Sequence, residues 1–263
     1  MSPSGSQHSP SRELGQFFTP DAVVDLAFRV LHWLAPAVSS GLLADISCGE
    51  GAFLAGAMRS GFRRDRLYGL DADPNLPALW KNRFSAAGPH LAVADGLLGL
   101  AVERFDVIVG NPPFAGGPDT AHMPALTPAY QWWQLSHARR PEGLPRELWF
   151  LERSLKLLKP NGLLAMVLPE GTLANRRWRP QREQLLENNQ IEAVIGLPRS
   201  TFRAARTTVK TCLIFLRKQE PRPGHIIRLA ELDEEELQHP RDLLEAWKQE
   251  AVVAEDCPWR RRG

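Results

Sequence analysis

Seven short apolar runs are spaced along this chain. They lie at residues 42–46, 67–71, 91–93, 106–109, 163–168, 191–195 and 211–216. A buried strand of a parallel sheet is apolar along its whole length, whereas a strand with one wet face alternates between apolar and polar residues. The sequence therefore predicts an α/β fold with a twisted, mostly parallel sheet of seven strands and helices on both faces.

Polar side chains lie at or just after the ends of the first four predicted strands. They are Asp45, Asp71, Asp95 and Asn111. Because parallel strands end at the same edge of a sheet, these side chains should lie close together. Open α/β sheets bind their ligands outside the carboxyl ends of the strands. We therefore expect a binding site at this edge.

A glycine pair follows the first of these strands. Gly49 and Gly51 allow the backbone to approach a ligand closely. Asp71, roughly 20 residues further on, suits a carboxylate that accepts hydrogen bonds from ribose hydroxyls. Leu54 takes the position of the third glycine of a pyrophosphate-binding turn. A nucleoside cofactor without a diphosphate, such as S-adenosylmethionine, fits better than NAD, and Asp45 could bind its ammonium group.

The sequence Asn-Pro-Pro-Phe occupies residues 111–114. The two prolines stiffen the turn and remove two backbone donors. An amide oxygen, a free carbonyl and an aromatic ring suit a planar substrate with an exocyclic NH2 group. Such a substrate is a nucleobase or, less often, a carboxamide. The alternative is an ordinary turn, because Asn-Pro is a common turn signal.

Together with Leu-Gly-Gln-Phe-Phe-Thr-Pro at residues 14–20, these motifs resemble the ordered motifs of amino-group DNA methyltransferases. The arrangement is similar to enzymes that modify adenine N6, above all the modification subunits of type I restriction-modification systems. The likeness runs from about residue 13 to residue 218. It implies a Rossmann-like S-adenosylmethionine-dependent methyltransferase fold.

The resemblance also implies roles for individual residues. The cofactor would be held by Phe18, Thr19, Asp45, Ser47, Cys48, Gly49, Gly51, Asp71 and Asp95. The catalytic motif would be Asn111, Pro112, Pro113 and Phe114, with Asn111 and the Pro112 carbonyl accepting from the target N6 and Phe114 stacking on the flipped base. Phe202 would be a second base-stacking aromatic residue.

Two arginine-rich clusters follow later strands. Arg176, Arg177, Arg179 and Arg182 surround Trp178, whereas Arg199, Arg203, Arg206 and Lys210 follow the next strand. Both clusters should lie at the same edge as Asn111, and Arg176, Arg177 and Arg203 are candidates to contact the phosphates of bound DNA. The alternative is an arginine-rich loop that is simply solvated.

The motifs divide the chain into three parts. Residues 1–11 are expected to form a disordered tail, residues 12–218 the catalytic domain, and residues 219–263 an extension with a short helix and a basic tail. An insertion at 115–145 is either a lid over the site or a short helix that caps the core through Trp132 and Trp133. A helix is expected at 21–34, with the Thr19 hydroxyl at its cap and Pro20 in its first turn.

Composition excludes several classes of protein. Three cysteines without paired spacing suit a reducing compartment, and no apolar run reaches the length of a membrane span, so a cytoplasmic location is expected. The histidines and cysteines show no metal-ligand spacing, so no metal is expected. The net charge of +2 does not decide whether the chain binds nucleic acid.

The sequence favours a DNA adenine-N6 methyltransferase of a restriction-modification or related system. DNA is the expected partner, and a separate specificity subunit could read its sequence, because residues 219–263 are too few for a typical reading domain. One alternative is methylation of an RNA base or a protein glutamine. Another is a non-catalytic DNA-binding subunit of a defence complex.

Overall fold

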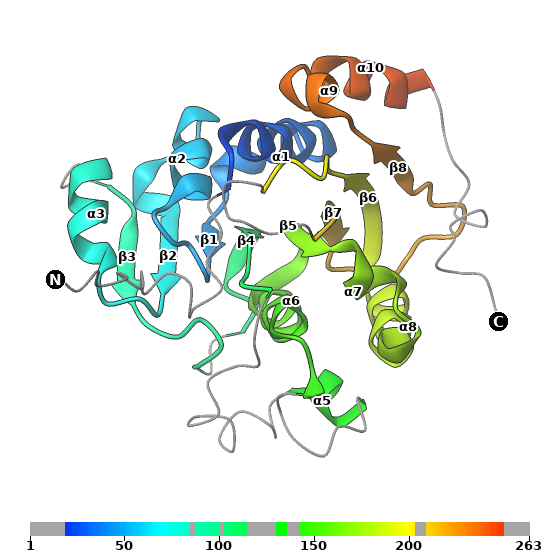
Figure 1. The fold of residues 1–263 in the computed structure, drawn as a ribbon, viewed down its shortest axis with the longest axis horizontal. Coiled ribbons are helices and arrows are strands. Elements are labelled where there is room, and N and C mark those ends of the chain that lie inside the picture. Colours follow the sequence, from blue (N-terminus) through cyan, green and yellow to red (C-terminus); the bar gives the residue numbers. More distant parts are fainter. Residues whose placement is uncertain are drawn as a thin grey trace, which may run out of the picture.

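The computed structural model describes residues 19–84, 88–99, 102–114, 130–135, 143–202 and 209–249. Eight strands form one sheet in the order β3-β2-β1-β4-β5-β7-β6-β8 (Figure 1). Only β7 runs antiparallel to its neighbours β5 and β6; the other five pairings are parallel. The strands are β1 (Leu43–Asp45), β2 (Leu67–Asp71), β3 (His90–Val93), β4 (Phe105–Gly110), β5 (Leu158–Pro169), β6 (Gln190–Gly196), β7 (Thr211–Arg217) and β8 (Arg228–Glu231).

All seven predicted strands are present, and the mostly parallel sheet is confirmed. The predicted number of strands was wrong, because β8 adds an eighth strand beside β6. Three of its four residues are partly buried and one is exposed. An edge strand of this kind needs no continuous apolar run, so the pattern that revealed the other strands is missing here.

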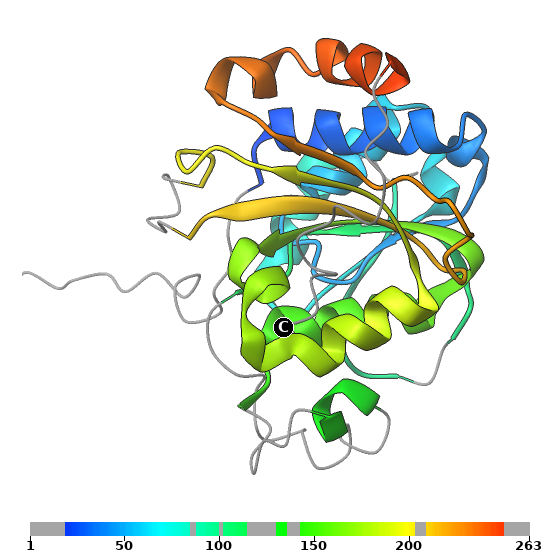
Figure 2. The same ribbon diagram turned by 90° about the vertical axis from the view of Figure 1, so that its right-hand side faces the viewer.

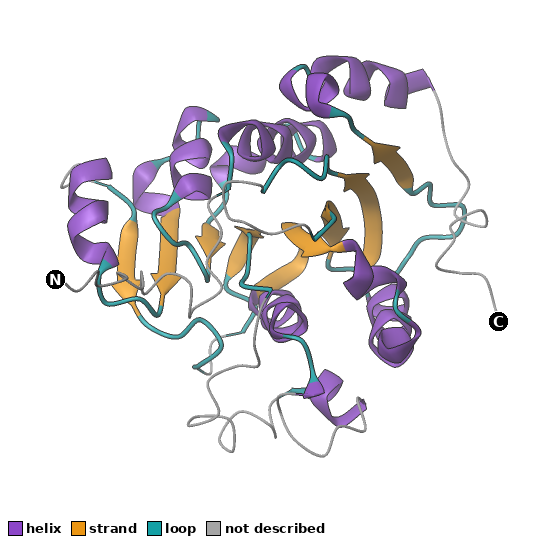
Figure 3. Ribbon diagram, viewed as in Figure 1, coloured by secondary structure: helices purple, strands orange, loops and turns teal. Residues whose placement is uncertain are grey.

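Helices cover both faces of the sheet (Figures 2 and 3). Side chains alternate along β5, so that Leu163, Ala165 and Val167 face one core and Leu164, Met166 and Leu168 face the other. On the first face lie α1 (Asp21–Leu34), α2 (Ala52–Arg59), α3 (Leu76–Arg83), α9 (Glu234–Gln238) and α10 (Arg241–Gln249). On the second lie α5 (Gln131–Leu135), α6 (Arg146–Leu157), α7 (Glu170–Ala174) and α8 (Arg179–Asn188). Short 3-10 turns span Val38–Ser40, Arg64–Arg66 and Arg176–Trp178.

Helix α1 has the predicted bounds but not the predicted cap. Its N-cap is Pro20, and no side chain caps the helix. The Pro20 carbonyl accepts from the amides of Val23 and Val24 at 3.0 and 3.2 Å. The Thr19 hydroxyl lies one residue too early for capping and is bound elsewhere, as described below.

The segment after residue 218 packs against α1. Trp247 of α10 is buried with its ring centroid 5.8 Å from that of Trp33 in α1. The Arg228 guanidinium of β8 lies 4.5 Å from the Trp33 ring centroid. Figure 2 shows the resulting layers, with α9 and α10 outside α1 and α1 outside the sheet. The ends of the chain, at 1–18 and 250–263, lie outside the described residues.

The second half of the predicted insertion contains α5. Tyr130 and Trp132 are buried in the core on the α6 side of the sheet. Glu152 of α6 accepts from the amides of Gln131 and Trp132 at 2.7 and 3.0 Å, which holds the first turn of α5 in place. For Trp132, the core-capping interpretation therefore describes the structure. Residues 115–129 and 136–142, and the Trp133 side chain, lie outside the described part.

Candidate active site

The carboxyl ends of β1 and β4 lie against each other. A Cβ atom built on Gly110 would be 3.2 Å from Asp45 Oδ1 and 3.6 Å from Ser47 Oγ. Any larger residue at position 110 would therefore displace this carboxylate. Asn111 follows directly, so the structure brings the predicted amide and the first predicted acid to one place.

The side-chain amide of Asn111 is held at one end only. Its Nδ2 donates to Thr19 Oγ1 at 3.1 Å. Its Oδ1 is buried and accepts no hydrogen bond from the residues that the structure describes. A buried acceptor without a donor costs about 1–3 kcal/mol, so native proteins seldom leave one without a reason. At the carboxyl end of β4, beside Asp45, such an acceptor is suited to a donor on a ligand.

The glycine turn after β1 has a backbone that other residues rarely adopt. Gly49 has φ +51° and Gly51 has φ +86°. A Cβ on Gly51 would lie 2.7 Å from the Phe84 ring, whereas one on Gly49 would meet no atom within 4 Å. The turn is packed at Gly51 and has room beside Gly49.

Hydrogen bonds fix this turn to the next strand. The Gly49 amide donates to Asp71 Oδ2 at 2.7 Å, and the Cys48 amide donates to the Leu70 carbonyl at 2.9 Å. Trp80 of α3 donates from Nε1 to the Gly49 carbonyl at 2.8 Å. No sequence pattern marked Trp80 as part of the site, because it lies on the following helix.

Two buried carboxyl groups lie at the centre of the site. Asp45 is 2% exposed and accepts from the Ser47 amide at 3.0 Å. Burial, opposed by hydrogen bonds from Ser47 and reinforced by the charge of Asp71, raises the pKa of Asp45 to about 8. Burial also raises the pKa of Asp71, against the effect of amide hydrogen bonds from Asp73 and Gly49. Such a pair favours a ligand that brings a positive charge or hydroxyl donors.

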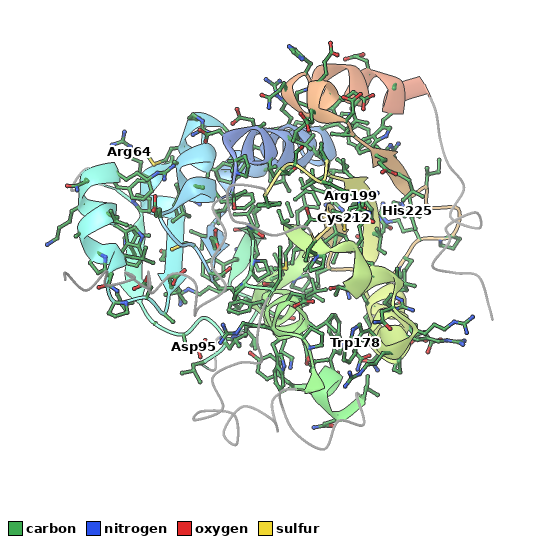
Figure 4. All side chains as sticks on the ribbon, in the orientation of Figure 1. Arg64, Asp95, Trp178, Arg199, Cys212 and His225 are labelled. Carbon is green, nitrogen blue, oxygen red and sulfur yellow. The ribbon has the colours of Figure 1, made fainter. Side chains whose placement is uncertain are left out.

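The loop that carries Asp95 lies beside the end of β1. A Cβ on Gly96 would fall 2.0 Å from the Ile46 carbonyl oxygen, so only glycine allows this approach. Asp95, labelled in Figure 4, accepts from the Leu97 amide at 2.9 Å. The hydroxyl of the buried Tyr130 donates to the Leu97 carbonyl at 2.7 Å. Tyr130 thus braces the Asp95 loop, a role that the sequence did not reveal.

Replacing Tyr130 with phenylalanine should lower the free energy of unfolding by about 1 kcal/mol, because the Leu97 carbonyl loses its donor while the ring packing is retained. For a domain of this size the melting temperature should fall by about 2–4 °C. Thermal unfolding followed by circular dichroism measures this. An unchanged melting temperature would show that Tyr130 contributes through its ring alone.

The predicted substrate-side residues have mixed placements. Phe202 is 3% exposed and belongs to the core beside Leu197, so its base-stacking role stays a prediction that would require the ring to move. Arg176 and Arg177 are exposed, and the Arg177 guanidinium carbon lies 4.6 Å from the centroid of the Trp178 ring. Phe18 and Arg203 lie outside the described residues.

Three other basic residues of the predicted clusters already have acceptors. Lys210 lies between Glu170 at 3.1 Å and Glu231 at 2.6 Å. Arg179 pairs with Glu183, and Arg182 donates to the Asn175 carbonyl. These contacts reduce the positive charge that the clusters offer to a phosphate.

Among the residues that the structure describes, no three His, Cys, Asp or Glu side chains gather closely enough to hold a metal ion. The helices in the same part of the chain include none that is long and apolar enough to cross a membrane.

The sheet order defines an α/β protein, and its polar residues gather at the carboxyl ends of the strands, where such proteins bind their ligands. The family model described as N-6 DNA Methylase matches residues 7–253. The chain belongs to this family.

Curated relatives and solved structures agree with this assignment. The chain is 24% identical over 209 residues to the type II methyltransferase M.CvrRI of Paramecium bursaria Chlorella virus XZ-6E. This alignment covers 79% of this chain and 49% of that protein. It is 26% identical over 227 residues to the type I restriction enzyme EcoEI methylase subunit of Escherichia coli, with coverage of 79% and 43%. The methyltransferase subunit of a type I restriction-modification system from Streptococcus thermophilus superposes with a TM-score of 0.67 at 20% identity, over 90% of this chain and 55% of that one.

The chain therefore spans about half the length of these relatives. The likeness to the solved structure shows a common fold. The Rossmann-like methyltransferase architecture expected from the sequence is thereby confirmed.

Proposed function

We propose that this chain is the catalytic part of a DNA methyltransferase that transfers a methyl group from S-adenosylmethionine to adenine N6 in a restriction-modification system. The observation that carries the proposal is the Asn111 amide, whose buried oxygen has no donor among the described residues. The family match supports DNA over the RNA-base and protein-glutamine alternatives. The intact acceptor supports an enzyme over a non-catalytic subunit.

The residues at the carboxyl edge fit this cofactor. The buried Asp45 carboxyl would bind its ammonium group, and the room beside Gly49 would admit its amino-acid part. Asp71 would accept from the ribose hydroxyls and Asp95 from the amino group of its adenine. When bound, S-adenosylmethionine supplies an electrophilic methyl group.

The target nitrogen needs help to react. The lone pair of adenine N6 is delocalised into the ring, which makes the nitrogen a poor nucleophile. Asn111 Oδ1 and the Pro112 carbonyl would each accept a hydrogen bond from N6 and so direct its lone pair out of the ring plane. Alignment of this kind can lower the activation free energy by about 7–11 kcal/mol in principle. Once N6 has gained the methyl group, it loses one of its two protons to solvent, which leaves neutral N6-methyladenine.

The target base has to leave the DNA stack before these groups can reach it. Flipping costs a few kcal/mol. Phe114 is partly buried against the core, and stacking of the flipped base on its ring would offset about 1–3 kcal/mol of the flipping cost. The exposed Arg176 and Arg177 would contact phosphates, and a specificity subunit or a further domain would select the sequence. The free Cys48 and Cys212 suit a cytoplasmic location.

The test is direct. The purified protein is incubated with S-adenosylmethionine and unmethylated DNA, and the digested nucleosides are analysed by mass spectrometry. We expect N6-methyladenine, with no signal when the cofactor is replaced by S-adenosylhomocysteine. DNA from several unmethylated genomes should be used, so that the recognition sequence is represented. Methylation of cytosine instead, or of RNA alone, would refute the proposal.

A further inference from the structure

We infer that Thr19 is a positioning residue that fixes which end of the Asn111 amide faces the target base. This inference rests on the proposed function and deepens it. The contact that carries it is the hydrogen bond from Asn111 Nδ2 to Thr19 Oγ1 at 3.1 Å, between residues 92 positions apart in the chain.

An amide side chain has two ends of nearly equal size and opposite character. The NH2 group donates and the oxygen accepts, so a half-turn about the last bond exchanges them. The amino group at adenine N6 donates hydrogen bonds, so the oxygen end of the Asn111 amide has to face it. An Asn111 turned the wrong way would present two donors to a group that is itself a donor.

Thr19 distinguishes the two ends once its own proton is donated to another acceptor of the site, because a hydroxyl that keeps that proton free can equally donate to Oδ1 of a turned amide. The Thr19 hydroxyl oxygen accepts from Nδ2 and thereby leaves Oδ1 directed away, where no described residue donates to it. The hydroxyl uses one lone pair for this bond, so its own proton remains for another acceptor in the site. Thr19 is 6% exposed, so water competes little for either group.

The Thr19 side chain bonds to Asn111 and does not cap the helix that follows it. Pro20 is the N-cap of α1, and the Thr19 side chain makes no capping bond. The stiff Pro20 ring fixes the backbone directly after Thr19. Helix α1, buried on the sheet, anchors this junction against movement.

The test compares Thr19→Val with Thr19→Ser. Valine has the same shape without the hydroxyl, whereas serine keeps the hydroxyl. With cofactor and DNA both saturating, we expect Thr19→Val to lower kcat about tenfold, which is the upper range for the loss of one neutral hydrogen bond. The separate variant Thr19→Ser should keep most of the wild-type kcat. If the valine variant changes only the KM for S-adenosylmethionine and kcat is unchanged, Thr19 binds cofactor alone and the inference is wrong.

A double-mutant cycle gives a second criterion. In an Asn111→Ala background, Thr19→Val should have no further effect on kcat, because there is no amide left to orient. A full additional loss would overturn the inference. Failure of the proposed function would show differently, as wild-type protein that forms no N6-methyladenine in DNA, so the two failures are distinguishable.

A measurement on the free protein is independent of turnover. With 15N-labelled asparagine, the Asn111 side-chain amide is assigned by its disappearance in Asn111→Ala. Thr19→Val should shift this signal and speed its exchange with water, whereas Thr19→Ser should preserve it. An unmoved signal in Thr19→Val would contradict the inference. Should the valine variant fail to fold, the pair Thr19→Ala and Thr19→Ser carries the same comparison.

Discussion

Replacing Asn111 with alanine should lower kcat for adenine methylation by about 10²–10³-fold, the range observed when one preorganised hydrogen-bonding group is removed from an active site. The buried Oδ1 has no other use among the described residues. The truncation also removes an unsatisfied acceptor, so the folded state should lose little stability. Cofactor affinity should change by less than about threefold, since the variant keeps the buried acids and the glycine turn.

The measurement pairs single-turnover kinetics with calorimetric titration of S-adenosylhomocysteine. Asn188→Ala is the matched control, because this exposed asparagine lies on α8 and bonds only locally to the Gln184 carbonyl. It should leave kcat unchanged. A fall in kcat of less than about tenfold for Asn111→Ala would mean that the amide does not contact the reacting nitrogen.

Replacing Asp45 with asparagine should have two opposite effects. It should abolish cofactor binding, because the ammonium group loses its counter-charge. It should also stabilise the free protein, increasingly so as the pH rises. The carboxyl of Asp45 ionises near pH 3.8 in the unfolded chain and near pH 8 in the folded one. Between these values the folded state binds more protons, so the wild-type protein loses stability with rising pH.

The neutral amide does not titrate and avoids this loss. At pH 8 the variant should exceed the wild type by at least about 2 kcal/mol, since one pKa unit corresponds to about 1.4 kcal/mol, whereas at pH 4 the two should be nearly equal. Urea unfolding at a series of pH values measures the difference. Asp21→Asn makes the same charge change at a carboxylate whose side chain is 73% exposed and should alter stability by less than about 1 kcal/mol. A pH-independent difference for Asp45→Asn would show that its pKa is not raised.

The parts of the fold that depend on local pattern were predictable. Six of the seven predicted strands are largely buried, and the exposed edge strand β3 still carries the short apolar run 91–93, so the strand ends place Asp45, Asp71, Asp95 and Asn111 at one edge. Strand β8 was not predictable in this way, because its four residues begin with arginine and end with glutamate and so form no apolar run.

The contacts within the site depend on tertiary structure. Thr19 precedes a helix, so a local rule assigned its hydroxyl to capping, and only the folded chain brings it to Asn111. Tyr130 reaches the Asp95 loop from an insertion that shows no periodicity of its own. Neither contact leaves a trace in the spacing of residues along the chain.

The reversed direction of β7 has a consequence for how such enzymes can diversify. β6 ends at the carboxyl edge and β7 begins there, with the Leu197 amide donating to the Thr211 carbonyl at 2.9 Å. The chain therefore leaves β6 and enters β7 at the same edge of the sheet, the one that carries Asn111. Doubling the length of such a loop costs only about 0.6 kcal/mol. Evolution can thus lengthen this connection between Phe202 and β7, and with it the surface beside the site, as long as the buried Leu197 and Phe202 keep their core contacts.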